Sequence, residues 1–132
     1  MKRIEVAVGV LFNENDEILI GQRTVKDKYY QKWEFPGGKL ENGESPEAAL
    51  VREFSEEVGV VIDASERFMV INHDYPDRHV RLHVQIIENY SQPVRSMEGQ
   101  ALQWVALNEL SSIDFLQGNR AIVEALIKRQ RA

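Results

Sequence analysis

Three glutamates, Glu53, Glu56 and Glu57, lie close together in an acidic stretch that spans residues 38–60. In a helix, spacings of three and four residues place such side chains next to one another. The like charges of Glu53 and Glu57 then cost roughly a few tenths of a kcal/mol unless a cation lies between them. Carboxylate oxygens suit Mg²⁺ or Mn²⁺, and Mg²⁺ commonly bridges carboxylates to substrate phosphates. The spacing therefore suggests a divalent-metal site for phosphate-ester or anhydride chemistry.

A structural interpretation of the same glutamates is an acidic helix face exposed to water. Arg52 could pair with Glu56 one turn along the helix, which would contribute about 0.3–0.5 kcal/mol. However, the carboxylates border the apolar stripe of the helix instead of lying opposite it, and this position favours a counter-ion.

The helix that must carry these side chains has clear ends in the sequence. Ser45 can cap it, Pro46 suits its first turn and Gly59 suits its C-terminal stop, which predicts a helix to about Val58. At 100° per residue, four apolar side chains share one arc and form the expected core stripe: Leu50, Val51, Phe54 and Val58.

Strands account for much of the remaining chain. Residues 4–12 and 17–23 are rich in β-branched side chains, and the polar turn between them predicts a hairpin. Pro36-Gly37-Gly38 is expected to end any regular element. Further strands are expected at residues 67–75, 80–86 and 102–107, and a second helix at residues 119–130. This order predicts one mixed α/β domain, residues 1–132, with helices packed on a sheet.

The composition limits the class of protein. A chain of 132 residues is the size of one domain, and its net charge of −5 argues against a nucleic-acid polymer as partner. The absence of cysteine excludes disulfides and thiol chemistry. The N-terminal apolar run is short and alternates, so it resembles neither a signal peptide nor a membrane span. We expect a cytoplasmic monomer that binds a small molecule and no membrane.

A nine-position pattern in this stretch resembles the signature of the Nudix hydrolases, G-x5-E-x7-R-E-U-x-E-E-x-G-U, where U is usually aliphatic. The matching residues are Gly38, Glu44, Arg52, Glu53, Phe54, Glu56, Glu57, Gly59 and Val60. Phe54 is a mild departure. The resemblance implies an α/β/α sandwich, with a mixed sheet between helices, and a divalent-metal pyrophosphohydrolase acting on a nucleoside diphosphate derivative.

Further segments resemble the bacterial members of this family that hydrolyse 8-oxo-dGTP. They are residues 1–10, 13–16, 34–38, 75–79 and 98–100, together with Asn119. The resemblance implies release of a monophosphate and pyrophosphate, which sanitises the nucleotide pool, with Mg²⁺ or Mn²⁺ as cofactor. The loop at residues 26–31, with Lys28 and two tyrosines, departs from these relatives.

The resemblance also implies roles for individual residues. The implied metal ligands are the carbonyl of Gly37 and the carboxylates of Glu53, Glu56, Glu57 and Glu98. The implied substrate-binding residues are Arg23, Glu34, Phe35, Arg78 and Asn119, and Asn119 would read the purine edge. We favour Glu53 over Glu98 as the catalytic base.

Structural alternatives exist for several of these residues. Arg23 could be a surface charge, Phe35 a core residue, and Asn119 the cap of the second helix. Arg78 could simply pair with Asp77.

Three functions are compatible with the sequence. The first is hydrolysis of oxidised purine triphosphates. The second is another Nudix specificity, for CTP, methylated dCTP or the 5′ end of RNA, although the acidic charge weighs against RNA. The third is a nucleotide sensor without catalysis, which the full set of motif glutamates disfavours.

Overall fold

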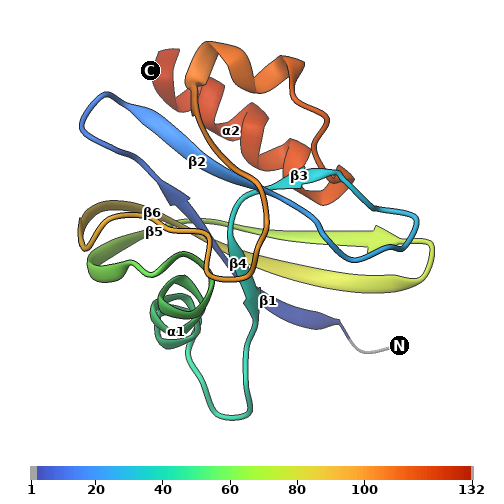
Figure 1. Cartoon of the computed structure of the whole chain (residues 1–132). Coiled ribbons are helices and arrows are strands. Elements are labelled where there is room, and N and C mark those ends of the chain that lie inside the picture. Colours follow the sequence, from blue (N-terminus) through green and yellow to red (C-terminus); the bar gives the residue numbers. More distant parts are fainter. Residues whose placement is uncertain (1–2, 132) are drawn as a thin grey trace.

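Two β-sheets lie between two helices, with α1 on one side and α2 on the other (Figure 1). The structure, a computed structural model, describes residues 3–131; Met1, Lys2 and Ala132, which the single-domain prediction includes, lie outside the described residues. In chain order the elements are β1 (Ile4–Leu11), β2 (Glu17–Gln22), β3 (Trp33–Glu34), β4 (Gly37–Lys39), α1 (Pro46–Val58), β5 (Val61–Tyr75), β6 (Arg78–Ser91), β7 (Leu102–Ala106), the 3₁₀ turns η1 (Leu107–Ser112) and η2 (Gln117–Asn119), and α2 (Arg120–Arg131).

The larger sheet is mixed and has the strand order β4-β1-β6-β5, whereas the smaller sheet is antiparallel and has the order β3-β2-β7. β1 runs parallel to β6 and antiparallel to β4. This arrangement confirms the predicted α/β sandwich. Within residues 3–131, neither helix has the length and apolar character needed to cross a membrane.

The predicted hairpin between residues 4–12 and 17–23 is wrong. β1 and β2 lie in different sheets, and their ends are joined by one β-bridge between Phe12 and Ile18 and by hydrogen bonds between Asn13 and Glu17. β1 instead pairs along its whole length with β6. Pairing with this long apolar strand buries both faces of β1, and that burial outweighs the local turn signal.

Alternate residues of β1 pack toward opposite helices. Val8 and Val10 belong to an apolar cluster that includes Leu126 of α2. Leu11 belongs to a second cluster that includes Leu50 of α1. Because both faces of β1 are packed, this strand and its neighbours form a fixed support for the loops at their ends.

Helix α1 begins and ends where the sequence predicts. Ser45 Oγ accepts a hydrogen bond from Ala48 N–H at 3.1 Å, and Pro46 is the first helical residue. Gly59 has a left-handed conformation with φ 69°, and its N–H donates to the carbonyl of Phe54. Because an L side chain is strained at this φ, glycine suits the position.

The prediction that Val51 belongs to the core stripe of α1 is wrong. Leu50, Phe54 and Val58 are fully buried, but Val51 is 45% exposed. The buried stripe instead includes Ala49. The buried stripe therefore follows residues four positions apart, Leu50, Phe54 and Val58. Val51 lies at the edge of the stripe that faces solvent.

The aromatic side chain of Phe54 is accommodated by a glycine on β1. A Cβ atom at Gly9 would lie 2.5 Å from Cε1 of Phe54. Because both groups are in a packed core, we expect Gly9→Ala to lower the free energy of unfolding by about 1–3 kcal/mol. Urea unfolding measures this change. Gly21→Ala is the matched control, because its nearest contact would be an ordinary 3.4 Å; equal losses in the two variants would contradict the prediction.

Candidate active site

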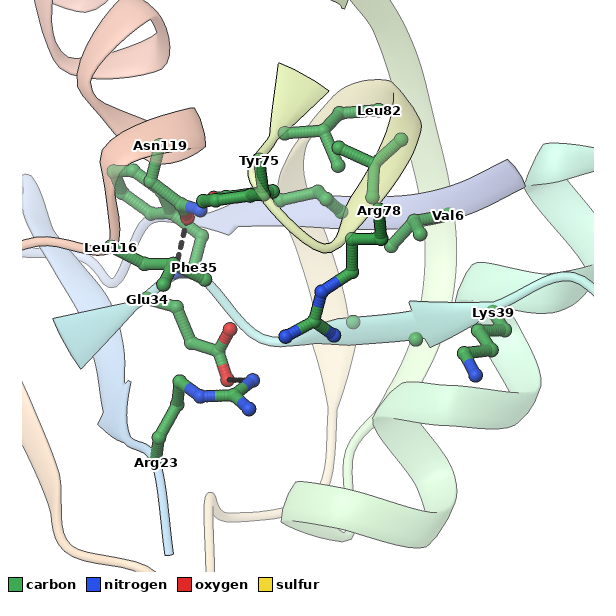
Figure 2. Close-up of a pocket in the computed structure, with 14 residues that line it drawn as sticks. Val6, Arg23, Glu34, Phe35, Lys39, Tyr75, Arg78, Leu82, Leu116 and Asn119 are labelled. Atoms are coloured by element: carbon green, nitrogen blue, oxygen red, sulfur yellow. Dashed lines mark hydrogen bonds and ion pairs between the residues drawn. The ribbon is translucent and has the colours of Figure 1, made fainter. Parts of the chain in front are cut away.

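All the side chains predicted to bind substrate line one cavity of about 190 Å³ (Figure 2). They are Arg23, Glu34, Phe35, Arg78 and Asn119. Four apolar side chains of β1 and β6 form part of its wall: Val6, Val8, Val80 and Leu82. An apolar cavity with a few polar groups at its rim is typical of small-molecule sites.

Asn119 is fixed at this cavity by a backbone contact. Its side chain is buried, and Oδ1 accepts a hydrogen bond from Phe35 N–H at 3.0 Å. The oxygen that could have capped α2 is therefore bonded to Phe35 instead. Because Oδ1 is engaged, the amide Nδ2 is the polar group that Asn119 can offer to a ligand.

Phe35 is both a core residue and a cavity residue. It is 3% exposed, and its ring stacks on Phe115 with the centroids 5.1 Å apart. The ring also lines the cavity beside Asn119. The two sequence interpretations of Phe35 are therefore compatible.

The two arginines meet around one carboxylate from the loop at residues 26–31. Arg23 Nη2 lies 3.0 Å from Asp27 Oδ2, and Arg78 Nη2 lies 3.9 Å from the same oxygen. Arg23 Nη1 also lies 3.8 Å from Glu34 Oε1, and Arg78 Nε lies 3.5 Å from Asp77 Oδ1. Arg78 thus pairs with Asp77, as the structural alternative proposed, and also lines the cavity.

Tyr29 from the same loop contacts two residues that line the cavity, Tyr75 and Arg78. Its hydroxyl donates to Asp77 Oδ1 at 2.9 Å, and its ring contacts Tyr75 edge-on at a centroid distance of 5.2 Å. The guanidinium carbon of Arg78 lies 5.0 Å from the ring centroid. The loop at residues 26–31 thus lies beside residues that line the cavity.

A second cavity of about 170 Å³ shares Arg23 and Glu34 with the first and is also lined by Glu57 and Glu98. Gln100 holds the loop that carries Glu98. Its Nε2 donates to the Glu57 carbonyl, and its Oε1 accepts from Glu98 N–H, both at 3.2 Å. These bonds place Glu98 next to the last turn of α1.

Glu53 lies between Gly38 and Arg52. A Cβ atom at Gly38 would lie 2.4 Å from Cδ of Glu53, so glycine allows this carboxylate to reach the backbone of β4. Arg52 Nη1 donates to Glu53 Oε1 at 2.8 Å, and Arg52 also binds Glu44 at 2.8 and 2.9 Å. The predicted Arg52–Glu56 pair is present but longer, at 3.4 Å. Arg52 therefore mainly orients Glu44 and Glu53.

Negative charges and burial act together on Glu57. Burial, followed by the charges of Glu53, Glu34 and Glu98, raises the pKa of Glu57 to about 8. Gly37 N–H donates to Glu57 Oε2 at 3.2 Å and only partly offsets this effect. A cation near Glu57 would favour its ionised form and lower this pKa.

The side chains predicted to bind metal do not form a coordination cage. Within residues 3–131, no group of three or more His, Cys, Asp or Glu side chains is arranged to hold a metal ion. The chemistry of the donors nevertheless fits a divalent cation, because they are carboxylates that repel one another and raise the pKa of Glu57. The residues present thus suit a metal whose remaining ligands come from substrate or water.

Gly37 and Gly38 do not end regular structure as predicted. They begin β4 and pair with Val8 and Ala7 of β1. A Cβ atom at Gly37 would lie 2.0 Å from the Ala7 carbonyl oxygen, so the strands approach too closely for any side chain. The interruption consists of Phe35 and Pro36, between β3 and β4, so Pro36 alone of the three residues lies where predicted.

Sequence reasoning missed Lys39, Tyr75 and Leu116 in the first cavity. Tyr75 ends β5 immediately before a turn, and Lys39 ends β4. Their positions at strand ends were a usable signal, because binding residues concentrate where strands give way to loops.

Comparisons with known proteins agree with this geometry. The NUDIX domain family matches residues 7–125. An 8-oxo-dGTP diphosphatase of Escherichia coli K12 is 39% identical, with 96% of this chain and 98% of the relative covered. A CTP pyrophosphohydrolase of the same organism is 30% identical over 100% of this chain and 97% of the relative. A structure from a study of MutT from Aliivibrio salmonicida and Vibrio cholerae is 32% identical, covers 97% of this chain and 99% of its own, and superposes with a TM-score of 0.83. With Glu53, Glu56 and Glu57 on α1 and the family match across most of its length, the chain belongs to the Nudix family.

Proposed function

We propose that this protein hydrolyses 8-oxo-dGTP and related oxidised purine triphosphates to the monophosphate and pyrophosphate, which would remove mutagenic precursors before DNA replication. The observation that carries this proposal is the pair of cavities joined through Arg23 and Glu34. One is apolar and contains Asn119, and the other contains the acidic side chains of Glu57 and Glu98. Several relatives that share most of the chain are named for this activity.

The first cavity would bind the base. Phe35 and the valines of β1 and β6 offer an apolar surface for a purine, and Asn119 Nδ2 offers hydrogen-bond donors to an acceptor on its edge. A buried donor that lacks its partner is costly, so this amide would discriminate against bases without a matching acceptor.

The positively charged side chains at the rim of the cavity would bind the phosphates. Arg23, Lys39 and Arg78 line the first cavity, and Arg23 also lines the second. Arg23 Nε is buried and makes no hydrogen bond to the described residues, so it can donate to a ligand oxygen. Charge-assisted bonds of this kind would direct the triphosphate from the base cavity toward Glu57 and Glu98.

We assign the metal to the carbonyl of Gly37 and the carboxylates of Glu53, Glu56, Glu57 and Glu98, with Mg²⁺ preferred and Mn²⁺ able to replace it. When bound, the cation neutralises negative charge that develops on the phosphate oxygens.

Glu53 would act as general base on the attacking water. Arg52 donates to its Oε1, so Oε2 is the oxygen that would accept the proton. Burial raises the pKa of Glu53, which makes it a better proton acceptor than an exposed carboxylate. As the water oxygen bonds to phosphorus, a bond to the oxygen that bridges the α- and β-phosphorus atoms breaks, which gives the monophosphate and pyrophosphate. Glu98 is the second candidate for this role.

The effect of Mg²⁺ on stability should depend on pH. In the metal-free protein the pKa of Glu57 is about 8, against an ordinary value of 4.5. Between these values the folded state holds a proton that the unfolded chain has lost, so this group contributes less stability as pH rises. Mg²⁺ binds the ionised carboxylate, so we expect it to raise the unfolding temperature more at about pH 8.5 than at about pH 6. Thermal unfolding with and without Mg²⁺ measures this, and an equal shift at both pH values would contradict the assignment of Glu57.

Phosphorus-31 NMR of the reaction products tests the proposed bond cleavage. We expect 8-oxo-dGTP to give the monophosphate and pyrophosphate in the presence of Mg²⁺. Orthophosphate and a nucleoside diphosphate would indicate attack at the terminal phosphate and would contradict the proposal.

Hydrolysis of CTP or methylated dCTP is the second candidate function, because one relative that covers the whole chain is named a CTP pyrophosphohydrolase. The apolar wall and Asn119 favour the purine.

We also propose that residues 1–132 form a single domain that acts as a monomer in the cytoplasm, where nucleotide precursors are used.

A further inference from the structure

We propose that the hydroxyl of Tyr75, together with Gly118, is a positioning device that holds Asn119 for base recognition. This inference rests on the proposed function, in which Asn119 reads the base. Tyr75 Oη accepts a hydrogen bond from Gly118 N–H at 2.7 Å, and both groups are buried. Tyr75 thus joins the end of β5 to the residue immediately before Asn119.

Gly118 leaves room for this hydroxyl because it has no side chain. A Cβ atom at position 118 would lie 2.6 Å from Tyr75 Oη, which is closer than real Cβ contacts allow. Its other neighbours would be at ordinary distances, with Tyr75 Cζ at 3.4 Å and His73 Cδ2 at 3.5 Å. The glycines with positive φ do not include Gly118, so its backbone conformation does not demand glycine. The hydroxyl of Tyr75 is therefore the main reason that a side chain cannot fit there.

The η2 turn is held from two directions. Tyr75 binds it from β5, and Phe35 N–H binds Asn119 Oδ1 from the connection between β3 and β4. Asn119 N–H also donates to the carbonyl of Leu116 at 2.9 Å, which closes the turn. Asn119 is part of η2, and its Oδ1 and backbone are hydrogen-bonded. The direction of its Nδ2 therefore depends on the position of η2 relative to β5.

The ring and the hydroxyl of Tyr75 have separable roles. The ring contacts Tyr29 at 5.2 Å and His73 at 4.4 Å between centroids, so it packs without the hydroxyl. Tyr75→Phe keeps these contacts and, among the described residues, removes only the hydrogen bond to Gly118. The buried N–H of Gly118 then lacks a partner, which favours displacement of η2.

The test is a double-mutant cycle on nucleotide binding with Tyr75→Phe, Gly118→Ala and the double variant. Calorimetry measures the Kd of 8-oxo-dGMP, the proposed product, without metal. We expect Tyr75→Phe to weaken binding about tenfold, as loss of one buried hydrogen bond would. Gly118→Ala should weaken it at least as much in the tyrosine background and have little effect in the phenylalanine background, where the clash is gone.

Kinetics separate positioning from a general structural role. Tyr75→Phe should raise KM for 8-oxo-dGTP with little change in kcat, and should lower the preference for 8-oxo-dGTP over CTP. Loss of folded protein would reduce activity toward both substrates equally. Tyr90→Phe is the matched control, because Tyr90 is a half-buried tyrosine of β6 that lies outside the lining of the first two cavities.

The outcomes separate this inference from the proposed function. If the wild-type protein binds 8-oxo-dGMP but Tyr75→Phe binds it equally well, or if the two substitutions have additive effects, the positioning role is wrong and the proposed function stands. If the wild-type protein binds no 8-oxo-dGMP, the proposed function is wrong and the inference is overturned with it.

Discussion

Glu57→Gln should lower the turnover of 8-oxo-dGTP by orders of magnitude and leave the fold intact. The amide has nearly the same shape as the carboxylate, and its oxygen can still accept the N–H of Gly37, which donates to Glu57 Oε2 at 3.2 Å. The amide is neutral, however, so its oxygen binds Mg²⁺ much more weakly than a carboxylate does. Steady-state pyrophosphate release measures turnover, and circular dichroism reports the fold.

Stability provides an independent check on Glu57→Gln. The charge of Glu57 is opposed by burial and by Glu53, Glu34 and Glu98. The neutral variant should therefore be at least as stable as the wild-type protein in metal-free solution above about pH 8, and Mg²⁺ should stabilise it less. Glu47→Gln is the control on the same helix, because Glu47 pairs with Arg67 at the distant first turn. Near-wild-type turnover of Glu57→Gln would exclude Glu57 as a metal ligand.

Gly38→Ala should reduce turnover on the order of 100-fold or more with little loss of stability. Its Cβ atom would lie 2.4 Å from Cδ of Glu53, so one of the two groups must move. The end of the flexible Glu53 side chain moves at low cost, whereas the paired strand β4 does not. The substitution should therefore displace the proposed base and leave the sheet unchanged.

Gly9→Ala is the informative contrast for Gly38→Ala. Its Cβ atom meets the packed ring of Phe54 and no carboxylate, so it should lower stability and preserve turnover below the unfolding temperature. Turnover assays and urea unfolding on both variants distinguish the two effects. Wild-type turnover in Gly38→Ala would show that the position of Glu53 is not critical.

The helix that carries the glutamates was predictable because its determinants are local. Ser45, Pro46 and Gly59 act through hydrogen bonds and backbone geometry within a few residues, and the structure places each in its expected role. Val51 was mispredicted because a smooth 100° projection does not show where the neighbouring sheet ends.

The partners of β1 were not predictable from local signals. The turn at residues 13–16 favours a hairpin, but β1 pairs with β6, which lies far along the chain. The same limit applies to Gly37 and Gly38, whose pairing with β1 is a long-range contact. Burial of apolar strands decides such pairings, and a sequence pattern does not specify which strands meet.

The residues around the candidate site also fall into two groups: those that the sequence identified and those whose role depends on long-range contacts. The family resemblance identified Arg23, Phe35, Arg78 and Asn119, and all four line one cavity. The resemblance includes the segment of Tyr75 but implied no role for this residue, because the role of its hydroxyl depends on a contact with Gly118 that only the folded chain creates.

The most direct measurement is kcat/KM with Mg²⁺ for 8-oxo-dGTP, dGTP, CTP and methylated dCTP under identical conditions, followed by pyrophosphate release. An enzyme that reads an oxidised purine through Asn119 should have its highest kcat/KM for 8-oxo-dGTP, mainly through a lower KM than for dGTP. A preference for either pyrimidine nucleotide, or tight nucleotide binding without pyrophosphate release, would contradict the proposed activity.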